Sequence, residues 1–262
     1  MSIMQGADPE AVEILSRDRL EGFRDKDDES DKVLVGRYLL NAAIAEALHP
    51  LLHAVEVVLR NRLNEAVSAK YPIEADLPDQ YHDYPSWLDA TAGPVTESHQ
   101  KHVVEAKNKV HKELRRQYGP GLASARRMRT PGRLVAALPF SFWVFLFDTD
   151  YSGTRDAPGN FWPELLPAVF PHKKPSVPLN VIRSRLRHLL VVRNRVMHHE
   201  RIHPYSAGKG LPWNPMTIRR EILELLGWMS PRAEKLVGRF DRLPEVMDPL
   251  NLRYLRWTPW LF

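Results

Sequence analysis

The sequence contains no cysteine, and this absence excludes several kinds of protein and site. Disulfide bonds, thiolate metal sites and cysteine nucleophiles all need a thiol. A chain without cysteine suits a reducing compartment, so we expect the protein to be cytoplasmic. Residues Met1 to Glu13 carry acids where a secretory signal has an apolar core, and we therefore expect no export segment.

Long apolar runs are also missing. The longest run, Leu134 to Leu146, is interrupted by Pro139. A membrane-spanning helix needs about 20 apolar residues. We therefore expect no spanning segment and no membrane partner.

Sustained alternation of apolar and polar residues, which is typical of strands, does not occur either. Apolar residues instead recur with a period near 3.6, which predicts an all-α fold. Pro50 and Pro231 lie inside two of the predicted helices, and we expect each to kink or divide its helix. The predicted helices cover residues 9–23, 33–69, 95–118, 132–147, 160–170, 178–199 and 214–240.

The chain is predicted to have three parts. Residues 1–31 form an acidic helix and connection, in which Asp25, Asp27, Asp28, Glu29 and Asp31 crowd together. Residues 32–245 form one helical domain. Residues 246–262 form a tail with Trp257 and Trp260, which we expect to dock on its own domain because such a tail rarely hangs free.

The net charge of +5 is unevenly placed. Bases crowd two segments, one from Lys101 to Arg133 and the other from Arg183 to Arg201. Such asymmetry favours a nucleic-acid partner. For the first segment, the solvated face of a helix is an equally good interpretation.

The second basic segment carries groups suited to RNA cleavage. On a helix Asn194 and His198 share a face, whereas Arg193 lies about 140° round from His198 and reaches it only by its long side chain or from a partner helix. An imidazole can move a proton near neutral pH, and a guanidinium can hold phosphate oxygens. The alternative is that these bases complement the helix dipole or pair with buried acids.

Three blocks of sequence, in order, resemble one family. Arg193 to Glu200 matches R-N-x-x-x-H-H-E, residues 56–61 read E-V-V-L-R-N, and Gly132 to Phe147 contains the apolar string L-P-F-S-F-W-V-F-L-F. Together they resemble the Abi-like (abortive infection) proteins of the HEPN ribonuclease superfamily. The resemblance spans Val33 to His203, and Arg201 departs from it because similar proteins usually have proline there.

This resemblance implies a HEPN-like helical bundle with additional helices and a metal-independent endoribonuclease without a cofactor, active in phage defence. It implies that Arg193 and His198 are the catalytic pair and that Asn194 orients them. A homodimer is also implied.

A toxic nuclease must be silenced, so an antitoxin protein or a small RNA is expected as a partner besides the RNA substrate. A non-catalytic RNA-binding or interaction protein of the same fold is the alternative. Supporting or RNA-binding roles are expected for His199, Glu200, Arg195, Glu56, Arg60 and Asn61.

On the earlier helix Glu56, Arg60 and Asn64 follow one another at four-residue steps and make a polar face. Glu56 is expected to hold Arg193 by a bidentate salt bridge, or Arg60 to contact phosphate. A local Glu56–Arg60 pair on the surface is an equally good interpretation.

A competing pattern overlaps the predicted site. His199 to His203 reads H-E-x-x-H, the zinc-hydrolase motif, and Glu221 or Glu224 would have to supply a third ligand. That motif needs a helix through His203, and Pro204 disfavours helical geometry there. Zinc hydrolysis is therefore the weaker alternative, and we expect no metal.

Overall fold

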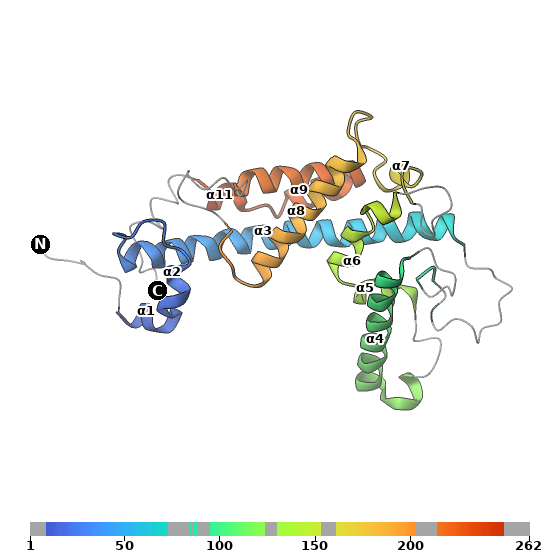
Figure 1. Cartoon of the computed structure of the whole chain (residues 1–262), viewed down its shortest axis with the longest axis horizontal. Helices are drawn as coiled ribbons and strands as arrows, with labels where there is room; N and C mark the ends of the chain where they lie inside the picture. Colours follow the sequence, from blue (N-terminus) through green and yellow to red (C-terminus); the bar gives the residue numbers. More distant parts are fainter. Residues whose placement is uncertain are drawn as a thin grey trace, which may run out of the picture. The chain divides into compact units, whose positions relative to one another are not determined.

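The computed structural model describes residues 9–72, 84, 86–88, 95–123, 130–152, 161–202 and 214–248 (Figure 1). In these ranges the chain forms α-helices, one short 3₁₀ helix and no strand, which confirms the predicted all-α class. The chain divides into two compact units. The first unit comprises Met1–Val55, Val191–Leu226 and Arg232–Phe262, and the second comprises Glu56–Leu190 and Gly227–Pro231. The predicted boundaries at residues 31 and 245, and the HEPN-like bundle, stay predictions.

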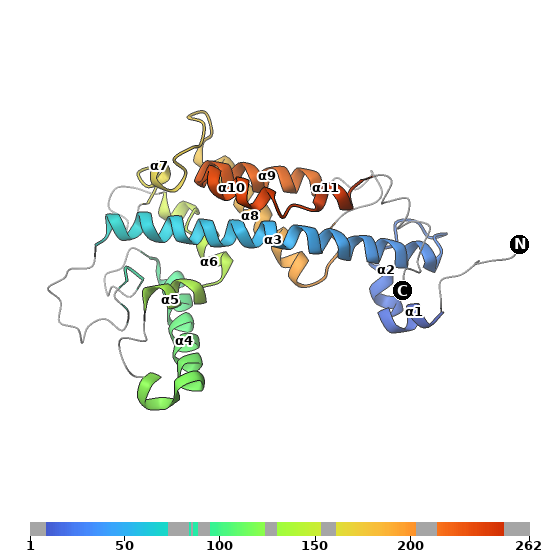
Figure 2. The ribbon, with the colours of Figure 1, turned by 180° about the vertical axis from the view of Figure 1, so that it is seen from behind.

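The first unit contains α1 (Pro9–Leu15), α2 (Arg17–Glu21), the first part of α3 (Asp31–Lys70) and the end of α8 (Leu179–Met197). It also holds most of α9 (Pro215–Met229) and of α10 (Pro231–Gly238), and α11 (Leu243–Val246). Figure 2 shows α11 beside the first part of α3, where Arg242 Nη1 lies 3.0 Å from Glu46 Oε1. The core of this unit includes Leu34, Ile44, Leu48, Leu51, Val192, Val196, Ile218 and Ile222.

Two expectations for the first unit need correction. The predicted helix 9–23 is interrupted at Ser16, which has a φ of 60° and whose hydroxyl accepts the Arg19 N–H to cap α2. Pro50, in contrast, lies inside α3 without dividing it. Pro50 is exposed, whereas Leu48, Leu51 and Leu52 beside it are buried, so packing on the opposite face holds the helix together.

Helix α3 is long and apolar enough to cross a membrane by length and composition alone. The core helix of a protein in water meets the same criterion. The expected absence of a membrane partner therefore stays a prediction.

The second unit contains the rest of α3, α4 (Glu97–Ala123), α5 (Pro131–Ala137) and α6 (Phe140–Phe145). The 3₁₀ helix Thr149–Tyr151, α7 (Leu166–Val169) and the start of α8 complete it. Helix α5 packs against α4, as Figure 1 shows.

Aromatic side chains fill the core of the second unit. Phe147 stacks on Trp162 with ring centroids 4.5 Å apart, and Tyr151 stacks on Phe161 at 5.2 Å. Trp87 and Trp143 are buried beside them, and their rings meet edge to face at 6.4 Å. Phe140, Phe142, Trp143 and Phe147 are therefore core residues, whereas Phe145 is half-buried and lies beneath the Arg187 guanidinium.

The other helices differ from their predicted bounds at a proline, at a glycine and in the segment 160–170. The segment 132–147 forms two helices because Leu138, which precedes Pro139, is extended (φ −73°, ψ 138°). Helix α4 is broken at Gly119, with a φ of 77°, where the predicted helix ends. Asn214 Oδ1 accepts the Met216 N–H at 2.9 Å, so the expected cap of α9 is confirmed. Of the predicted helix 160–170 only Leu166–Val169 is α-helical, and Asn160 lies outside the described residues.

Candidate functional site

The predicted catalytic residues lie at the end of α8, within the first unit. Val192 and Val196 are buried and fix one side of this last part of the helix, and Ile202 is buried just beyond it. Asn194 and His198 are exposed, and Arg193 is half-buried. Asn194 and His198 therefore both lie outside the core, and the apolar side chain of Met197 between them is 46% exposed.

The two side chains of Arg193 and Asn194 are in contact. Arg193 Nη1 donates to Asn194 Oδ1 over 3.4 Å, at the long end of hydrogen-bonding distance. The backbone N–H of His198 donates to the carbonyl of Asn194 at 2.9 Å, so His198 closes the last turn of the helix. The guanidinium, the amide and the imidazole thus come from two successive turns at one helix end.

Helix α8 ends in a Schellman motif directly after His198. The Glu200 N–H donates to the Arg195 carbonyl at 2.8 Å, and the His199 N–H donates to the Val196 carbonyl at 3.3 Å. His199 has a φ of 56°, in the left-handed region that glycine usually occupies at this position. A residue with a Cβ pays about 1–2 kcal/mol for that conformation. Backbone strain of this kind is found preferentially at functional sites.

Three side chains of the first unit hold the residues that follow His198. Arg19 Nη2 donates to the His199 carbonyl at 2.7 Å. Asn41 Nδ2 donates to the Glu200 carbonyl at 3.1 Å, and the Ile202 N–H donates to Asn41 Oδ1 at 2.7 Å. Arg201 Nη2 lies 2.6 Å from Asp25 Oδ1. The departure at Arg201 thus has a structural role, because its charge ties the turn to the acidic N-terminal segment.

That acidic segment forms an ion-pair network rather than a plain solvated loop. Arg37 lies 2.5 Å from Glu29 and 3.5 Å from Asp25, and all three side chains are largely buried. Hydrogen bonds from Arg37 lower the pKa of Glu29 to about 2, and backbone N–H groups of Asp25 and Lys26 add to this effect. Asp25 and Glu29 are therefore engaged within their own unit.

Arg195 and Glu200 also belong to the turn. Arg195 Nη1 donates to the Arg201 carbonyl at 3.0 Å, and Arg195 Nε lies 3.9 Å from Glu200 Oε2. Both side chains retain exposed surface. These contacts stabilise the turn, and a role in binding RNA stays a prediction.

The predicted supporting residues of α3 belong to the second unit. Glu56 and Arg60 are half-buried and Asn61 is exposed. Asn64, the third member of their polar face, accepts the Trp87 indole N–H at 2.9 Å and so has a structural role. The proposed bridge between Glu56 and Arg193 stays a prediction.

The zinc-hydrolase pattern is not supported. Helix α8 ends at Met197, so His199 and Glu200 are not helical, and His203 lies outside the described residues. The motif needs two histidines one helical turn apart. Within the described ranges no three His, Asp or Glu side chains form a group able to hold a metal ion.

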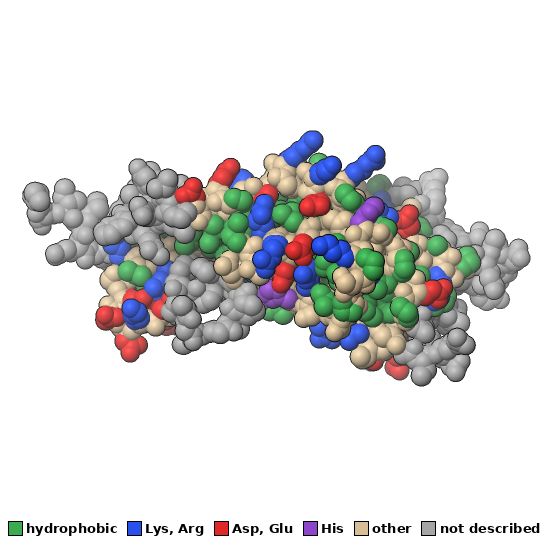
Figure 3. Space-filling view, turned by 90° about the horizontal axis from the view of Figure 1, so that it is seen from above, with side chains coloured by type: hydrophobic (Ala, Val, Ile, Leu, Met, Phe, Trp, Pro, Cys, Tyr) green, Lys and Arg blue, Asp and Glu red, His purple; other side chains and the backbone are tan. Residues whose placement is uncertain are grey.

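Several bases of the two basic segments are already engaged within the second unit. Arg183 Nε donates to the Phe147 carbonyl at 2.6 Å, Arg187 pairs with Asp148 at 2.7 Å, and the Arg185 guanidinium lies 4.7 Å from the Trp228 ring. The bases of α4 lie mainly opposite its buried residues Val103, Ala106, Val110 and Leu114. Figure 3 shows Lys and Arg side chains next to Asp and Glu side chains on one face. Charge alone therefore does not mark out a binding surface.

A second histidine cluster lies in the core of the second unit. His99 is buried, with Nδ1 3.1 Å from Thr96 Oγ1 and its ring against those of Phe142 and Tyr151. Burial lowers the pKa of His99, and the nearby His102 lowers it further. Burial also raises the pKa of Tyr151. The Tyr151 hydroxyl accepts the Thr96 N–H at 3.1 Å, so these groups join the start of α4 to the aromatic core.

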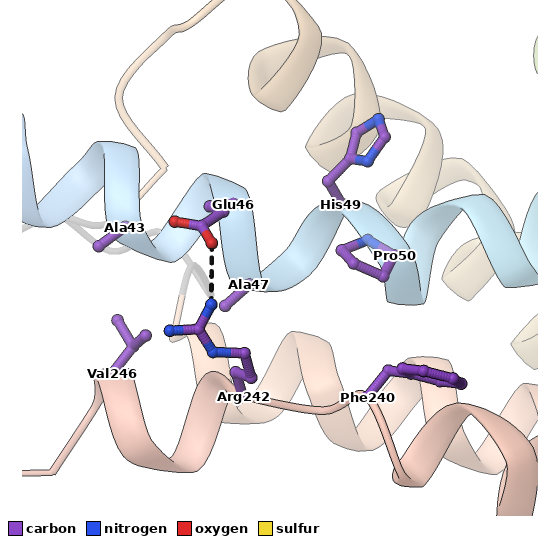
Figure 4. Close-up of a pocket in the computed structure, with 8 residues that line it drawn as sticks. All are labelled: Ala43, Glu46, Ala47, His49, Pro50, Phe240, Arg242 and Val246. Atoms are coloured by element: carbon purple, nitrogen blue, oxygen red, sulfur yellow. Dashed lines mark hydrogen bonds and ion pairs between the residues drawn. The ribbon is translucent and has the colours of Figure 1, made fainter.

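A pocket in the first unit is lined by α3 and by the residues around α11 (Figure 4). Glu46 and Arg242 pair across it, and Ala43, Ala47, Pro50, Phe240 and Val246 make it largely apolar. His49 is its one further titratable lining residue. In Figure 4 the His49 imidazole points away from the Glu46–Arg242 pair, and these two side chains bind each other, so the end of α8 remains the better candidate site.

Sequence reasoning missed Asn41, Arg19 and Asp25, which contact residues 159 to 180 positions away. For Asn41 the sequence does contain one indication of a structural role. It lies on the apolar face of its helix, between Leu40 and Ile44, and a polar residue there must find a hydrogen-bond partner.

Comparisons with known proteins give no match: no protein-family model, no curated protein and no solved structure matches this chain.

Proposed function

We propose that this chain is a metal-independent endoribonuclease in which Arg193 and His198 act on the RNA. One observation carries the proposal: an exposed imidazole lies at the fixed end of a buried helix, directly before a strained turn, with a guanidinium and an amide one turn earlier. The resemblance to Abi-like proteins supports it with the same residues.

The chemistry is a transesterification within the RNA. His198 takes the proton of a 2′-hydroxyl, the 2′-oxygen attacks the adjacent phosphorus, and the 5′-oxygen leaves with a proton from water or a second acid. Arg193 holds the non-bridging oxygens as negative charge builds on them. The products are a 2′,3′-cyclic phosphate and a 5′-hydroxyl, and no step needs a metal.

Asn194 orients the guanidinium, because its side-chain oxygen accepts from Arg193. His199, Glu200 and Arg195 are proposed to support the site, together with Glu56, Arg60 and Asn61. By resemblance, the enzyme is proposed to act as a cytoplasmic homodimer in abortive infection. An antitoxin protein or a small RNA would hold it inactive until infection.

The second candidate is a non-catalytic RNA-binding protein. One observation favours it: Arg195 lies in the last turn of α8, where the helix dipole stabilises positive charge, and this by itself explains a base at that end of the helix. This candidate would bind RNA through the same bases and leave it intact.

Cleavage of total RNA by the purified protein in EDTA tests the proposal. Wild type should produce fragments with 2′,3′-cyclic phosphate ends, and His198→Ala should lose about 10² to 10⁴ in rate. Equal RNA binding by both forms without cleavage by either would favour the second candidate.

His172→Ala is the matched control, because His172 is also an exposed histidine but lies in the turn after α7. It should cleave as wild type does. Activity that appears only after zinc is added would contradict the metal-independent proposal.

A further inference from the structure

The direction in which His198 leaves the helix depends on the turn behind it. His199 is held at a positive φ that a side chain with a Cβ disfavours. The hydrogen bonds of the Schellman motif do not by themselves fix the chain beyond Glu200. Contacts from outside α8 are therefore needed to keep the segment 199–202 in place.

Asn41 makes the most specific of these contacts. Its amide donates to the Glu200 carbonyl and accepts the Ile202 N–H, so one side chain bridges two backbone groups two residues apart. A neighbouring strand would make the same pair of hydrogen bonds. The Asn41 side chain is 4% exposed, so water cannot easily replace it.

The other two contacts are weaker constraints. Arg19 and Arg201 are long side chains, and Arg19 is exposed. Each binds the turn at one residue, through the His199 carbonyl and through the ion pair with Asp25, respectively. Asn41 instead holds the backbone on both sides of Arg201 from within the long helix α3.

We propose that Asn41 is a positioning residue, which acts on catalysis by fixing the turn that directly follows His198 and thereby the direction of the His198 side chain. The inference rests on the proposed ribonuclease function for its catalytic consequence. Its structural part, that Asn41 holds the segment 200–202, can be judged separately.

Amide hydrogen exchange of Ile202 tests the structural part. In wild type the Ile202 N–H is buried and bonded to Asn41, so it should exchange slowly. Asn41→Ala should raise its exchange rate at least about tenfold. The matched control is Asn214→Ala, which removes an asparagine acceptor from the Met216 N–H in the same unit and should leave the Ile202 rate unchanged.

Single-turnover cleavage of RNA tests the catalytic part. Asn41→Ala should lower the rate constant by about 10- to 100-fold with little change in the apparent KM, because a displaced imidazole binds RNA no worse but accepts the proton less well. Asn214→Ala should cleave as wild type does.

Failure of the positioning role and failure of the proposed ribonuclease function give different experimental results. An Ile202 exchange rate in Asn41→Ala that equals the rate in Asn214→Ala overturns the positioning role, and so does wild-type cleavage by Asn41→Ala. Absence of cleavage by wild type overturns the proposed function, and the exchange result alone then decides whether Asn41 fixes the turn. If Asn41→Ala does not fold, Asn41→Asp replaces it. This variant keeps the acceptor for Ile202 but loses the donor to Glu200, so it should still lower the cleavage rate.

Discussion

Two histidines of this chain differ in how the fold packs them, one in a core and the other at an exposed helix end. His99 lies in the aromatic core of the second unit, bonded to Thr96 and enclosed by the rings of Phe142 and Tyr151. His198 lies at the end of α8 in the first unit and is exposed. Burial lowers the pKa of His99, and the packed imidazole contributes to the core. His198, in contrast, is accessible from solvent.

The largest expected effect is that alanine at His198 lowers the rate of RNA cleavage, whereas alanine at His99 lowers the free energy of unfolding. His198→Ala should lose about 10² to 10⁴ in RNA cleavage with almost no change in the free energy of unfolding. His99→Ala should lose about 2–4 kcal/mol of that free energy because it leaves a cavity, while its folded fraction cleaves normally. Paired cleavage assays and denaturant titrations measure both. Loss of cleavage in folded His99→Ala would break the comparison.

Next in size is the effect of Arg193→Lys. Lysine keeps the charge but loses the planar fork that grips two phosphate oxygens, so kcat/KM should fall about 10- to 100-fold. Arg187→Lys is the control, since Arg187 pairs with Asp148 in the second unit and should tolerate the change. Equal kcat/KM values for the two variants would remove Arg193 from the proposed site.

A smaller effect is expected from the pH dependence of stability. Because the pKa of His99 is lowered in the folded chain, the unfolded chain binds more protons just below pH 6.5. The free energy of unfolding therefore falls as the pH decreases below 6.5, until the folded pKa is reached. His99→Phe should show a smaller fall than wild type between about pH 7 and about pH 5. Denaturant titrations at several pH values, with exposed His53→Gln as control, measure it.

The smallest expected effect concerns His199→Gly. Glycine adopts the left-handed conformation without strain, so the free energy of unfolding should rise by about 1 kcal/mol. His172→Gly, at an exposed position without a positive φ, should instead destabilise the protein slightly. Thermal unfolding of both variants compares them. A lower melting temperature for His199→Gly would mean that the imidazole contributes more than the strain costs.

Periodicity predicted the all-α class, because local spacing determines which residues share one face of a helix. It missed the interruption at Ser16, and of the predicted helix 160–170 only Leu166–Val169 is α-helical in the described part. Proline chemistry predicted the break at Pro231 but misjudged Pro50 and Pro139. At Pro50 the packing of Leu48 and Leu51 stabilises the helix by more than the lost hydrogen bond destabilises it. Packing between distant segments cannot be predicted from a local sequence pattern.

Contacts between distant residues could not be predicted. The ties of Arg19, Asp25 and Asn41 to residues 199–202 join segments far apart in the chain, and no spacing rule connects them. The left-handed conformation of His199 was equally hidden, because helix ends of this kind usually carry glycine.

The tryptophans of the described part, Trp87, Trp143, Trp162 and Trp228, all belong to the second unit. Their fluorescence emission reports on the aromatic core of that unit. When that core opens, Trp162 loses its stack with Phe147, and its emission intensity or wavelength should change. None of them lies in the first unit, where His198 and Asn41 are found. The emission of these four indoles therefore follows the core of the second unit, whereas hydrogen exchange at a single amide such as Ile202 follows the unit that carries the candidate site directly.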